Sequence, residues 1–475
     1  MRKTKIVCTI GPASESVTVL KELMKAGMNV ARINFSHGGI EEQLDKINNV
    51  KQAREELGKP IALMLDTKGP EIRTGKLDSA PVELRTGGKF VLTTKDIVGS
   101  RTRVSITYKK LYKEVKVKNT ILLDDGKIEL KVEKIENEEI HCKVVHGGYL
   151  GNRKGVNVPN VKVNIPNLTE KDIEDIKAGA QHGFDYIAAS FIRKAEDVQD
   201  IRALLKENGG EKIKIISKIE NREGIDNFDS ILRASDGIMI ARGDLSVEVP
   251  MEEVPILQKQ FIKKCYMAGK PVITATQMLE SMIVNTRPTR AEVSDVANSV
   301  FDLTGAIMLS AETALGDNPL ECVQTMDTIA TTVENSIHYW SRFNDREYSN
   351  CSYEVNMNRS ICTTAMNMDA KAIFAYTHTG DTPRVIAGFS PNCPIYAVTA
   401  NPKTFNQLSL VWGIDVMLVD KEKSIDEMIK ISIDSKKDEG TITKGDYVVI
   451  AGGGNVFEGD ENKPTSRMIG GVIKI

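Results

Sequence analysis

Hydrophobic positions along the chain fall into short β-branched runs that alternate with longer segments of helical period. Nearly continuous apolar runs of this kind indicate parallel strands that are buried on both faces. Each run except the third is followed by a helical pattern, whereas the third leads into a long insertion before its helix near residues 169–181. The eight runs lie at residues 5–11, 29–36, 61–67, 186–192, 213–220, 237–245, 271–277 and 305–313.

Eight strand–helix units in about 250 residues are typical of a (β/α)8 barrel. An open, doubly wound sheet is the structural alternative, because it uses the same alternation of strands and helices. The sequence therefore predicts an α/β protein in which residues 1–69 and 168–345 form a (β/α)8 TIM barrel.

The insertion and the C-terminal part have patterns of their own. In residues 70–167, runs such as TRVSITY and KIELKVEKI alternate between apolar and polar positions, and a DDG turn at residues 124–126 stands between such runs. These are signs of hairpins, so we predict an inserted all-β lid domain that leaves the barrel from the end of a strand. After residue 345, the runs AIFAYTH, PIYAVTA, GIDVMLV and DYVVIAGG alternate with helical segments, which predicts a C-terminal α/β domain over residues 346–475.

Composition narrows the class of partner. The 63 Lys and Arg residues nearly balance the 65 Asp and Glu residues, so no overall charge favours nucleic acid or an anionic membrane, and a small molecule is the expected partner. The 7 cysteines include no CxxC pair, which fits a reducing compartment and argues against a disulfide framework or a zinc site. No run approaches the ~18 apolar residues of a membrane span, and the apolar stretch near the N-terminus is too short for a signal peptide. We expect a cytoplasmic protein.

Polar side chains gather at the predicted C-terminal ends of the barrel strands, where enzymes with this fold carry their chemistry. Lys218 and Glu220 are two residues apart on one strand and therefore face the same side, and Asp244 ends the next strand beside Glu220. Two carboxylates without a nearby histidine or cysteine are hard oxygen ligands that suit Mg2+ or Mn2+. The other polar residues at these strand ends are Arg32, Asn34, Ser36, Asp66, Thr67, Arg242, Thr276, Ser310 and Glu312.

A structural cluster of ion pairs is the alternative interpretation of this rim. Burying charges costs free energy unless something compensates. Stability alone does not favour a rim that combines the charged residues Asp66, Glu220, Asp244, Lys218, Arg32 and Arg73. We therefore favour a metal ion together with an anionic substrate, whose phosphate or carboxylate the basic groups would hold.

Six long motifs follow one another in the barrel part of the chain: VARINFSHG, LDTKGPEIRTG, KIISKIENREGI, IARGDLSVE, ATQMLESM and RPTRAEVSDVAN. In this order and spacing they resemble the pyruvate kinase family, and the insertion and third domain fall where that family has them. The resemblance implies an enzyme that transfers the phosphoryl group of phosphoenolpyruvate to ADP and protonates the enolate, which gives pyruvate and ATP. It also implies Mg2+ (or Mn2+) and K+ as cofactors.

The resemblance implies a role for each residue at the rim. Lys218 would stabilise charge on the phosphoryl group in transfer, and Glu220 and Asp244 would bind the divalent ion. Thr276 and the backbone of Gly243 and Asp244 would meet the substrate carboxylate, and Thr276 would belong to a proton relay near the methylene carbon. The residues implied to contact the transferring phosphate or the nucleotide are Arg32, Arg73, Lys154 and His37. Taken alone, Lys154 and His37 would be ordinary loop residues.

A monovalent-cation site is also implied by the resemblance. Its oxygen ligands would come from two neighbouring strand ends, at Asn34, Ser36, Asp66 and Thr67. Without the resemblance, the NFS segment would be interpreted as a turn held by its own side chains. Family members that need potassium resemble this chain at Glu71, where potassium-independent members tend to have lysine. We therefore predict activation by K+.

The segment THTGDTPR places hydroxyls and a glycine between a strand and a helix of the third domain, a shape suited to holding phosphate. The family binds phosphorylated effectors at this loop, so we predict an allosteric enzyme. Helix capping alone is the alternative, and His378, Asp381 and Pro383 depart from the family's usual pattern. The resemblance also suggests a homotetramer, and the end of the chain at Ile475 predicts no additional C-terminal domain of the kind that some bacterial members carry. The predicted effector residues are Thr377, Thr379, Gly380 and Thr382.

Two other functions stay open at this point. A different metal-dependent barrel enzyme acting on pyruvate or enolpyruvate, such as an aldol lyase, would not need the nucleotide-facing Arg73 and Lys154. A catalytically silent effector-binding protein would not need an intact set of the reacting residues Lys218, Glu220, Asp244 and Thr276.

Overall fold

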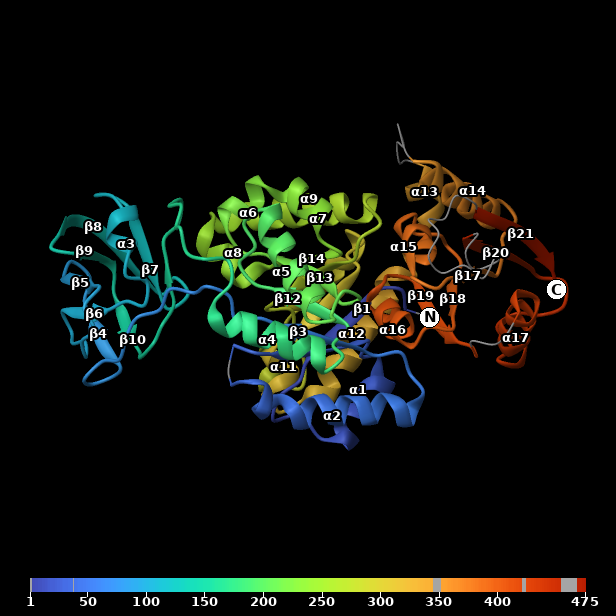
Figure 1. Cartoon of the computed structure of the whole chain (residues 1–475), viewed down its shortest axis with the longest axis horizontal. Coiled ribbons are helices and arrows are strands. Elements are labelled where there is room, and N and C mark those ends of the chain that lie inside the picture. Colours follow the sequence, from blue (N-terminus) through green and yellow to red (C-terminus); the bar gives the residue numbers. More distant parts are fainter. Residues whose placement is uncertain (1, 37, 345–351, 421–423, 454–467) are drawn as a thin grey trace.

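The protein has three parts, which follow one another along its longest axis (Figure 1). A computed structural model describes residues 2–36, 38–344, 352–420, 424–453 and 468–475. A barrel lies in the middle, an inserted sheet domain lies at one end, and a C-terminal α/β domain lies at the other end. None of the helices within these ranges combines the length and the apolar character that a membrane crossing requires.

The middle part is a closed barrel of parallel strands, as the alternation of apolar runs predicts. The first strand pairs with the last, Lys5 beside Ala306, which closes the sheet and rules out the open, doubly wound alternative. The strands are β1 (Lys5–Thr9), β2 (Val30–Asn34), β3 (Ala62–Asp66), β12 (Tyr186–Ala189), β13 (Lys214–Ile219), β14 (Gly237–Ala241), β15 (Val272–Ala275) and β16 (Ala306–Leu309).

Helices surround the barrel because each has one apolar face that must be buried against the strands. The main hydrophobic core lies between strands and helices, and a second cluster, which includes Val7 and Met64, fills the barrel interior. The helices of this part are α1 (Val17–Ala26), α2 (Ile40–Leu57), α4 (Glu170–Gln181), α5 (Ala195–Glu207), α6 (Arg222–Asp226), α7 (Phe228–Ala234), α8 (Arg242–Glu248), α9 (Val254–Met267), α10 (Arg290–Phe301), α11 (Ala311–Ala314), α12 (Pro319–Glu334) and α13 (Tyr339–Asn344), with 3-10 turns η1 (Met251–Glu253) and η2 (Glu280–Ile283).

The inserted domain, called the lid below, is built from two small sheets with a hydrophobic core of their own. The predicted turn is present: Asp124 and Asp125 have positive φ angles and join two antiparallel strands. The lid contains the short helix α3 (Leu111–Glu114) and the strands β4 (Val82–Leu84), β5 (Lys89–Thr93), β6 (Arg103–Ser105), β7 (Thr120–Leu123), β8 (Ile128–Glu136), β9 (Glu139–His146), β10 (Gly148–Leu150) and β11 (Val156–Asn157).

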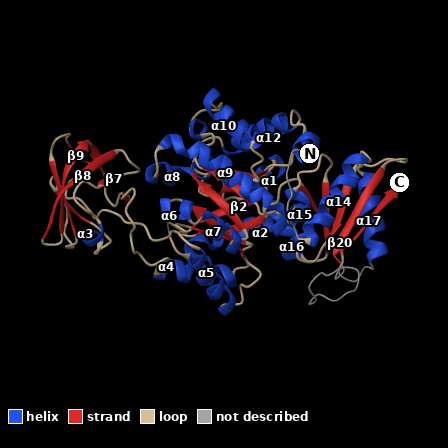
Figure 2. Cartoon of the chain, turned by 90° about the horizontal axis from the view of Figure 1, so that it is seen from above, coloured by secondary structure: helices blue, strands red, loops and turns tan. Residues whose placement is uncertain are grey.

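The C-terminal domain has a five-stranded sheet, in which the four predicted strands are parallel and a final, antiparallel strand completes one edge. Figure 2 shows helices α14, α15 and α17 beside this sheet. Its elements are α14 (Tyr353–Asn367), β17 (Ala372–Tyr376), α15 (Asp381–Gly388), β18 (Ile395–Thr399), α16 (Pro402–Gln407), η3 (Leu408–Leu410), β19 (Ile414–Leu418), α17 (Ile425–Asp438), β20 (Tyr447–Gly453) and β21 (Met468–Lys474).

One segment of the C-terminal domain closes the amino-terminal end of the barrel. Leu410 is fully buried and belongs to the apolar cluster inside the barrel. Beside it, the Tyr186 hydroxyl donates to the backbone oxygen of Gln407 at 2.5 Å, and Ser409 Oγ accepts the backbone N–H of Ala62 at 3.1 Å. The barrel and the C-terminal domain therefore share part of their core.

Several predicted segments begin or end elsewhere, and the strand expected over residues 305–313 spans only Ala306–Leu309. The strand expected over residues 237–245 stops at Ala241, and α8 begins at Arg242, so Asp244 lies in the first turn of a helix, where a carboxylate is favoured by the exposed N–H groups. The strand expected over residues 186–192 stops at Ala189. After the seventh strand, the α-helix begins only at Arg290, after a proline at position 288.

Candidate active site

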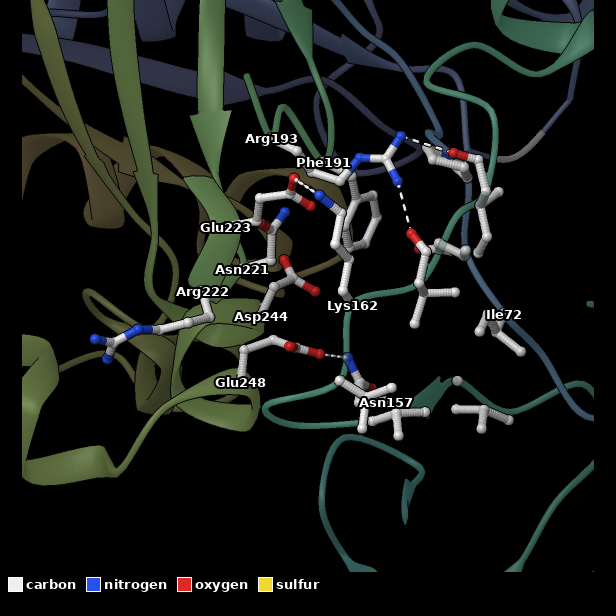
Figure 3. Close-up of a pocket in the computed structure, with 18 of the residues that line it drawn as sticks. Ile72, Asn157, Lys162, Phe191, Arg193, Asn221, Arg222, Glu223, Asp244 and Glu248 are labelled. Atoms are coloured by element: carbon white, nitrogen blue, oxygen red, sulfur yellow. Dashed lines mark hydrogen bonds and ion pairs between the residues drawn. The ribbon is translucent and has the colours of Figure 1, made fainter. Parts of the chain in front are cut away.

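The carboxyl ends of the barrel strands face the lid across a cleft of about 700 Å3 (Figure 3). Lid residues such as Arg73 and Lys154 line one wall, and barrel residues such as Asn221 and Asp244 line the other. The cleft thus brings together three residues that are far apart in the sequence and that the motifs had predicted to share one site, Arg73, Lys154 and Asp244.

Lys218 is the centre of a buried network of hydrogen bonds at this end of the barrel. Its Nζ lies 3.0 Å from Asp66 Oδ1, 3.0 Å from Glu220 Oε1 and 2.7 Å from Ser190 Oγ. The predicted orientation of Lys218 and Glu220 toward the same side is confirmed by this contact. Three oxygen acceptors leave the ammonium little freedom, so Lys218 is fixed before any substrate arrives.

Arg32 reaches the same network from the neighbouring strands. Its Nε donates to Asp66 Oδ2 at 2.6 Å, and its Nη1 donates to Thr9 Oγ1 at 2.8 Å. Asp66 is completely buried, and its two oxygens divide between Arg32 and Lys218. The Asp66 carboxylate therefore orients both basic side chains at the same end of the barrel.

Burial and neighbouring charges shift the pKa values of these groups in opposite directions. Burial alone would lower the pKa of Lys218, but Asp66 and Glu220 outweigh it and raise that pKa. Burial opposes the ionisation of Asp66, yet Arg32 and Lys218 lower its pKa. Burial raises the pKa of Glu220 to about 7, against the attraction of Lys218 and with the repulsion of Asp244. Burial likewise raises the pKa of Asp244. Asp66 is thus fully compensated, whereas Glu220 and Asp244 are not.

The donor set at Glu220 and Asp244 fits a divalent cation. Neither carboxylate has enough positive charge around it to compensate for its burial, and a bound cation would supply that charge. Across the ranges that the structure describes, no group of three or more acidic, histidine or cysteine side chains could hold a metal ion by itself. Mg2+ commonly takes one or two carboxylates and completes its shell with water and substrate oxygens, so two protein ligands are enough.

Thr276 and the first turn of α8 form a second polar corner. Thr276 has a φ of 70°, a conformation that β-branched residues rarely adopt, and its Oγ1 accepts the Gly243 N–H at 2.9 Å. Arg242 turns away from the cleft and pairs with Asp295 at 2.7 Å. The strained backbone at Thr276 marks a position that the surrounding structure holds in place.

The lid contributes two basic side chains that lie beside each other. The backbone N–H of Thr74 donates to the Lys154 oxygen at 2.8 Å, which fixes the segment that carries Arg73 next to Lys154. Arg73 pairs with Glu71 at 2.6 Å, and Lys154 pairs with Asp124 at 3.0 Å. His37, predicted near the nucleotide, lies outside the described residues.

The four residues predicted to bind a monovalent cation lie at two adjacent strand ends. Asn34 and Asp66 are register partners on β2 and β3. Asn34 Oδ1 accepts the Ser36 N–H at 3.0 Å, which is the turn contact expected without a cation, and Thr67 Oγ1 accepts the Ser190 N–H at 3.1 Å.

The predicted effector loop joins β17 to α15. Thr377 Oγ1 accepts the Gly380 N–H at 2.8 Å, and Gly380 has a positive φ that suits glycine. Thr379 donates to Asp381 at 2.7 Å, and Asp381 also pairs with Arg384 at 2.8 Å. These contacts hold the loop through its own side chains. Thr382 follows in the first turn of α15.

Three residues of the network were missed by the sequence analysis: Thr9 at the end of β1, and Ser190 and Phe191 after β12. Ser190 Oγ donates to the Thr67 oxygen at 2.6 Å and contacts Lys218, and the Phe191 N–H donates to Glu220 Oε2 at 2.5 Å. Phe191 has a φ of 55°, which is unusual for an aromatic residue. Both follow β12 directly, so the end of that strand was the signal available in the sequence.

The fold and site define a barrel enzyme suited to an anionic substrate and a divalent cation, with basic side chains of the lid facing two barrel carboxylates. Sequence profiles for "Pyruvate kinase, barrel domain" and "Pyruvate kinase, alpha/beta domain" match residues 1–323 and 356–463. The chain belongs to the pyruvate kinase family.

Individual relatives agree along nearly the whole length. A pyruvate kinase of Bacillus licheniformis is 49% identical and aligns over 100% of this chain and 81% of its own length. One from Clostridium acetobutylicum is 50% identical over 95% of this chain and 96% of its own. The crystal structure of a pyruvate kinase from Cryptosporidium parvum superimposes with a TM-score of 0.93 at 38% identity, and covers 100% of this chain and 96% of that one.

Proposed function

We propose that the cleft between lid and barrel carries out the pyruvate kinase reaction with Lys218 as its central catalytic residue. The phosphoryl group leaves the enol oxygen of phosphoenolpyruvate and is accepted by an oxygen of the ADP β-phosphate, and the enolate then takes up a proton at carbon. The observation that carries this proposal is the fixed ammonium of Lys218, held among Asp66, Glu220 and Ser190 at the metal-binding end of the cleft. Transfer of this kind depends on positioning and charge neutralisation.

Glu220 and Asp244 would hold Mg2+ or Mn2+. The bound ion supplies positive charge that neutralises substrate oxygens while the phosphoryl group moves. Arg32, oriented by Asp66 and Thr9, contacts the same phosphoryl group. Arg73 and Lys154 bind the nucleotide phosphates from the lid, and a nucleotide contact by His37, which is outside the described residues, stays a prediction.

The substrate carboxylate would be bound where α8 begins. The backbone of Gly243 and Asp244 and the hydroxyl of Thr276 surround one corner, and the absence of a side chain at Gly243 allows close approach. Thr276 Oγ1 can also pass on a proton, which makes it part of the relay that protonates the enolate. Its positive φ supports a functional constraint at this position.

The direct test is a coupled assay with phosphoenolpyruvate, ADP, Mg2+ and K+, followed by pyruvate formation. Lys218→Met should lower kcat by at least ~100-fold while phosphoenolpyruvate still binds, because the lost interaction is strongest in the transition state. Lys206→Met, which removes an exposed lysine of α5 outside the cleft, is the matched control and should keep its turnover. Absence of pyruvate with the wild-type chain would end the proposal, and full turnover of Lys218→Met would remove Lys218 from its role.

Potassium activation is proposed through Asn34, Ser36, Asp66 and Thr67, supported by their position at two adjacent strand ends. Turnover should be higher in potassium than in sodium-only buffer. Glu71→Lys should reduce this difference, because potassium-independent family members tend to have lysine at this position. Equal turnover of the wild-type chain in both buffers would contradict the proposal.

Regulation, assembly and location complete the proposal. A phosphorylated effector would bind at Thr377, Thr379, Gly380 and Thr382, and its chemical identity is left open.

A homotetramer is supported by exposed apolar side chains on the barrel, including Met251, Ile256 and Leu315, and light scattering would give the mass. The reduced state of the six described cysteines fits the cytoplasm.

A further inference from the structure

The lid contacts the barrel through the segment by which the chain returns from it, residues 156–165, called the return segment here. Three side-chain contacts join this segment to the barrel (Figure 3). Arg193 donates to the backbone oxygens of Val163 and Ile165 at 2.9 and 2.7 Å. Lys162 Nζ lies 3.0 Å from Glu223 Oε1, and Asn157 Nδ2 donates to Glu248 Oε1 at 3.0 Å.

The contact between Asn157 and Glu248 differs from the other two in what it connects. Asn157 belongs to β11 and follows Lys154 by three residues. Glu248 ends α8 and follows Asp244 by four residues, about one helical turn. The hydrogen bond therefore joins a lid strand that begins two residues after Lys154 to the helix whose first turn contains Asp244.

The lid and the barrel also come close to each other at a second point, next to this hydrogen bond. A Cβ atom built on Gly126, in the turn after β7, would lie 3.9 Å from Val247 Cγ1, so the turn passes close to α8. That turn also contains Asp124, which pairs with Lys154. The lid turn, Lys154 and Asn157 thus form one unit that contacts the last turn of α8.

The surroundings of Glu248 make its hydrogen bond with Asn157 stronger than the neighbouring, exposed ion pair between Lys162 and Glu223. Glu248 is half-buried, and burial raises its pKa while the Asn157 amide lowers it, so the amide interacts favourably with the charged form. The Lys162 side chain is 70% exposed, and solvent screens its pair with Glu223. Hydrogen bonds to partly buried charged groups contribute more than surface ion pairs.

We propose that the hydrogen bond between Asn157 and Glu248 sets the position of the lid over the metal-binding end of the barrel, which makes both side chains positioning residues for phosphoryl transfer. This inference rests on the proposed function, because it takes Lys154 as nucleotide-facing and Asp244 as a metal ligand. Neither Asn157 nor Glu248 needs to touch a reacting atom. Their effect is to hold the lysine of the lid at a fixed distance from the carboxylate of α8.

The test uses steady-state kinetics with ADP and phosphoenolpyruvate varied in turn. Asn157→Ala and Glu248→Ala should each raise KM for ADP and lower kcat, by about tenfold in kcat/KM for ADP, the equivalent of one hydrogen bond to a charged group. The thermal unfolding midpoint should not change, because lid and barrel have separate cores. Glu248→Gln keeps an oxygen that can accept the amide N–H and should retain most activity.

The double variant Asn157→Ala/Glu248→Ala should be no worse than either single variant, because both remove the same interaction. Asn164→Ala is the matched control on the return segment and should keep its kinetics, because the Asn164 amide bonds within the lid to Glu114 and does not line the cleft. Wild-type values of KM and kcat for Asn157→Ala would overturn the inference. So would additive losses in the double variant, or a loss in Glu248→Gln equal to that in Glu248→Ala.

Mn2+ binding without nucleotide separates this inference from the proposed function. Asn157→Ala should bind Mn2+ like the wild-type chain, because the lid contact does not supply a ligand. Asp244→Asn should lose Mn2+ affinity. If Asp244→Asn binds Mn2+ normally, the metal assignment fails, whereas the kinetic results on Asn157 and Glu248 still decide the positioning role.

Discussion

At the scale of single residues, the site depends on an unequal distribution of charge. Asp66 faces both Arg32 and Lys218 and is compensated, so its pKa is low. Burial raises the pKa of Glu220 to about 7, because Lys218, which Glu220 shares with Asp66, does not offset it and Asp244 adds repulsion. Asp66 is the best-paired carboxylate and orients the two basic side chains. Glu220 and Asp244 are the least compensated and are available to a metal ion.

This difference predicts a pH dependence of metal binding. A divalent cation needs ionised Glu220, so Mn2+ affinity should increase as pH rises through about 7, with an affinity about tenfold higher at pH 8 than at pH 6. The stability of the metal-free chain should change with pH in the opposite direction. Because the pKa of Glu220 is higher in the folded chain than in the unfolded chain, the free energy of unfolding should fall as pH rises from the unfolded pKa toward 7.

Paramagnetic resonance titrations of Mn2+ at several pH values would measure this dependence. Glu220→Gln is the control, and its weak residual binding should lack the steep part of the profile. A wild-type affinity that stays constant between pH 6 and pH 8 would show that Glu220 is already ionised at pH 6.

At the scale of elements, the period-two arrangement of a strand was the most informative part of the sequence. It placed Lys218 and Glu220 on one side, and their side chains are in contact. Ser190 and Phe191 could not be recognised in the same way, because the apolar run over residues 186–192 includes them although the strand ends at Ala189. Asp244 was assigned to the right region but to the wrong element, since one apolar run spans the end of β14 and the start of α8.

The effector loop and the domain limits show what local pattern leaves open. The segment around Thr377 has the hydroxyls of a phosphate site, but hydrogen bonds within the loop use several of them. The limits at residues 70, 167 and 345 stay predictions, since a change in period marks a boundary only to within a few residues.

The start of α4 offers a prediction at this scale. Thr169 and Asp172 form a capping box, and Asp172 Oδ1 also accepts the Gly69 N–H at 3.0 Å, which ties the helix to the point where the chain leaves for the lid. Thr169→Ala should lower the free energy of unfolding by about 1 kcal/mol, because the N-terminal N–H groups lose an acceptor.

Thermal unfolding of Thr169→Ala, followed by circular dichroism, would test this expectation. Thr169→Ser keeps the hydroxyl and should stay close to wild type. If both variants unfold at the wild-type temperature, the cap does not contribute to the stability of the barrel.

At the scale of the whole molecule, the barrel and the C-terminal domain behave as one packed unit, while the lid has its own core. Lys5, fully buried in β1, donates to the Ile414 oxygen at 2.6 Å, and Lys3 donates to the Pro391 and Asn392 oxygens at 3.1 and 2.8 Å. Lys3 also lies 3.8 Å from the centre of the Tyr339 ring. The first residues of the chain are therefore fixed by its last domain.

Leu410 allows this shared core to be tested. Leu410→Ala should destabilise the protein by about 2–5 kcal/mol, because it leaves a cavity at the end of the barrel. Leu418→Ala removes the same side chain from a position that is 48% exposed and should cost little. Calorimetry would compare the two, and equal unfolding temperatures would show that the end of the barrel does not depend on Leu410.

The pairing of β1 with β16 has a consequence for synthesis on the ribosome. The barrel cannot close until residue 309 has emerged, and its amino-terminal end is not covered until residue 410 follows. The sheets of the lid lie between residues 82 and 157, so the lid can assemble much earlier from neighbouring segments. We expect the inserted domain to fold first, and the barrel, whose segments flank it in the sequence, to fold only after its last strand has been synthesised.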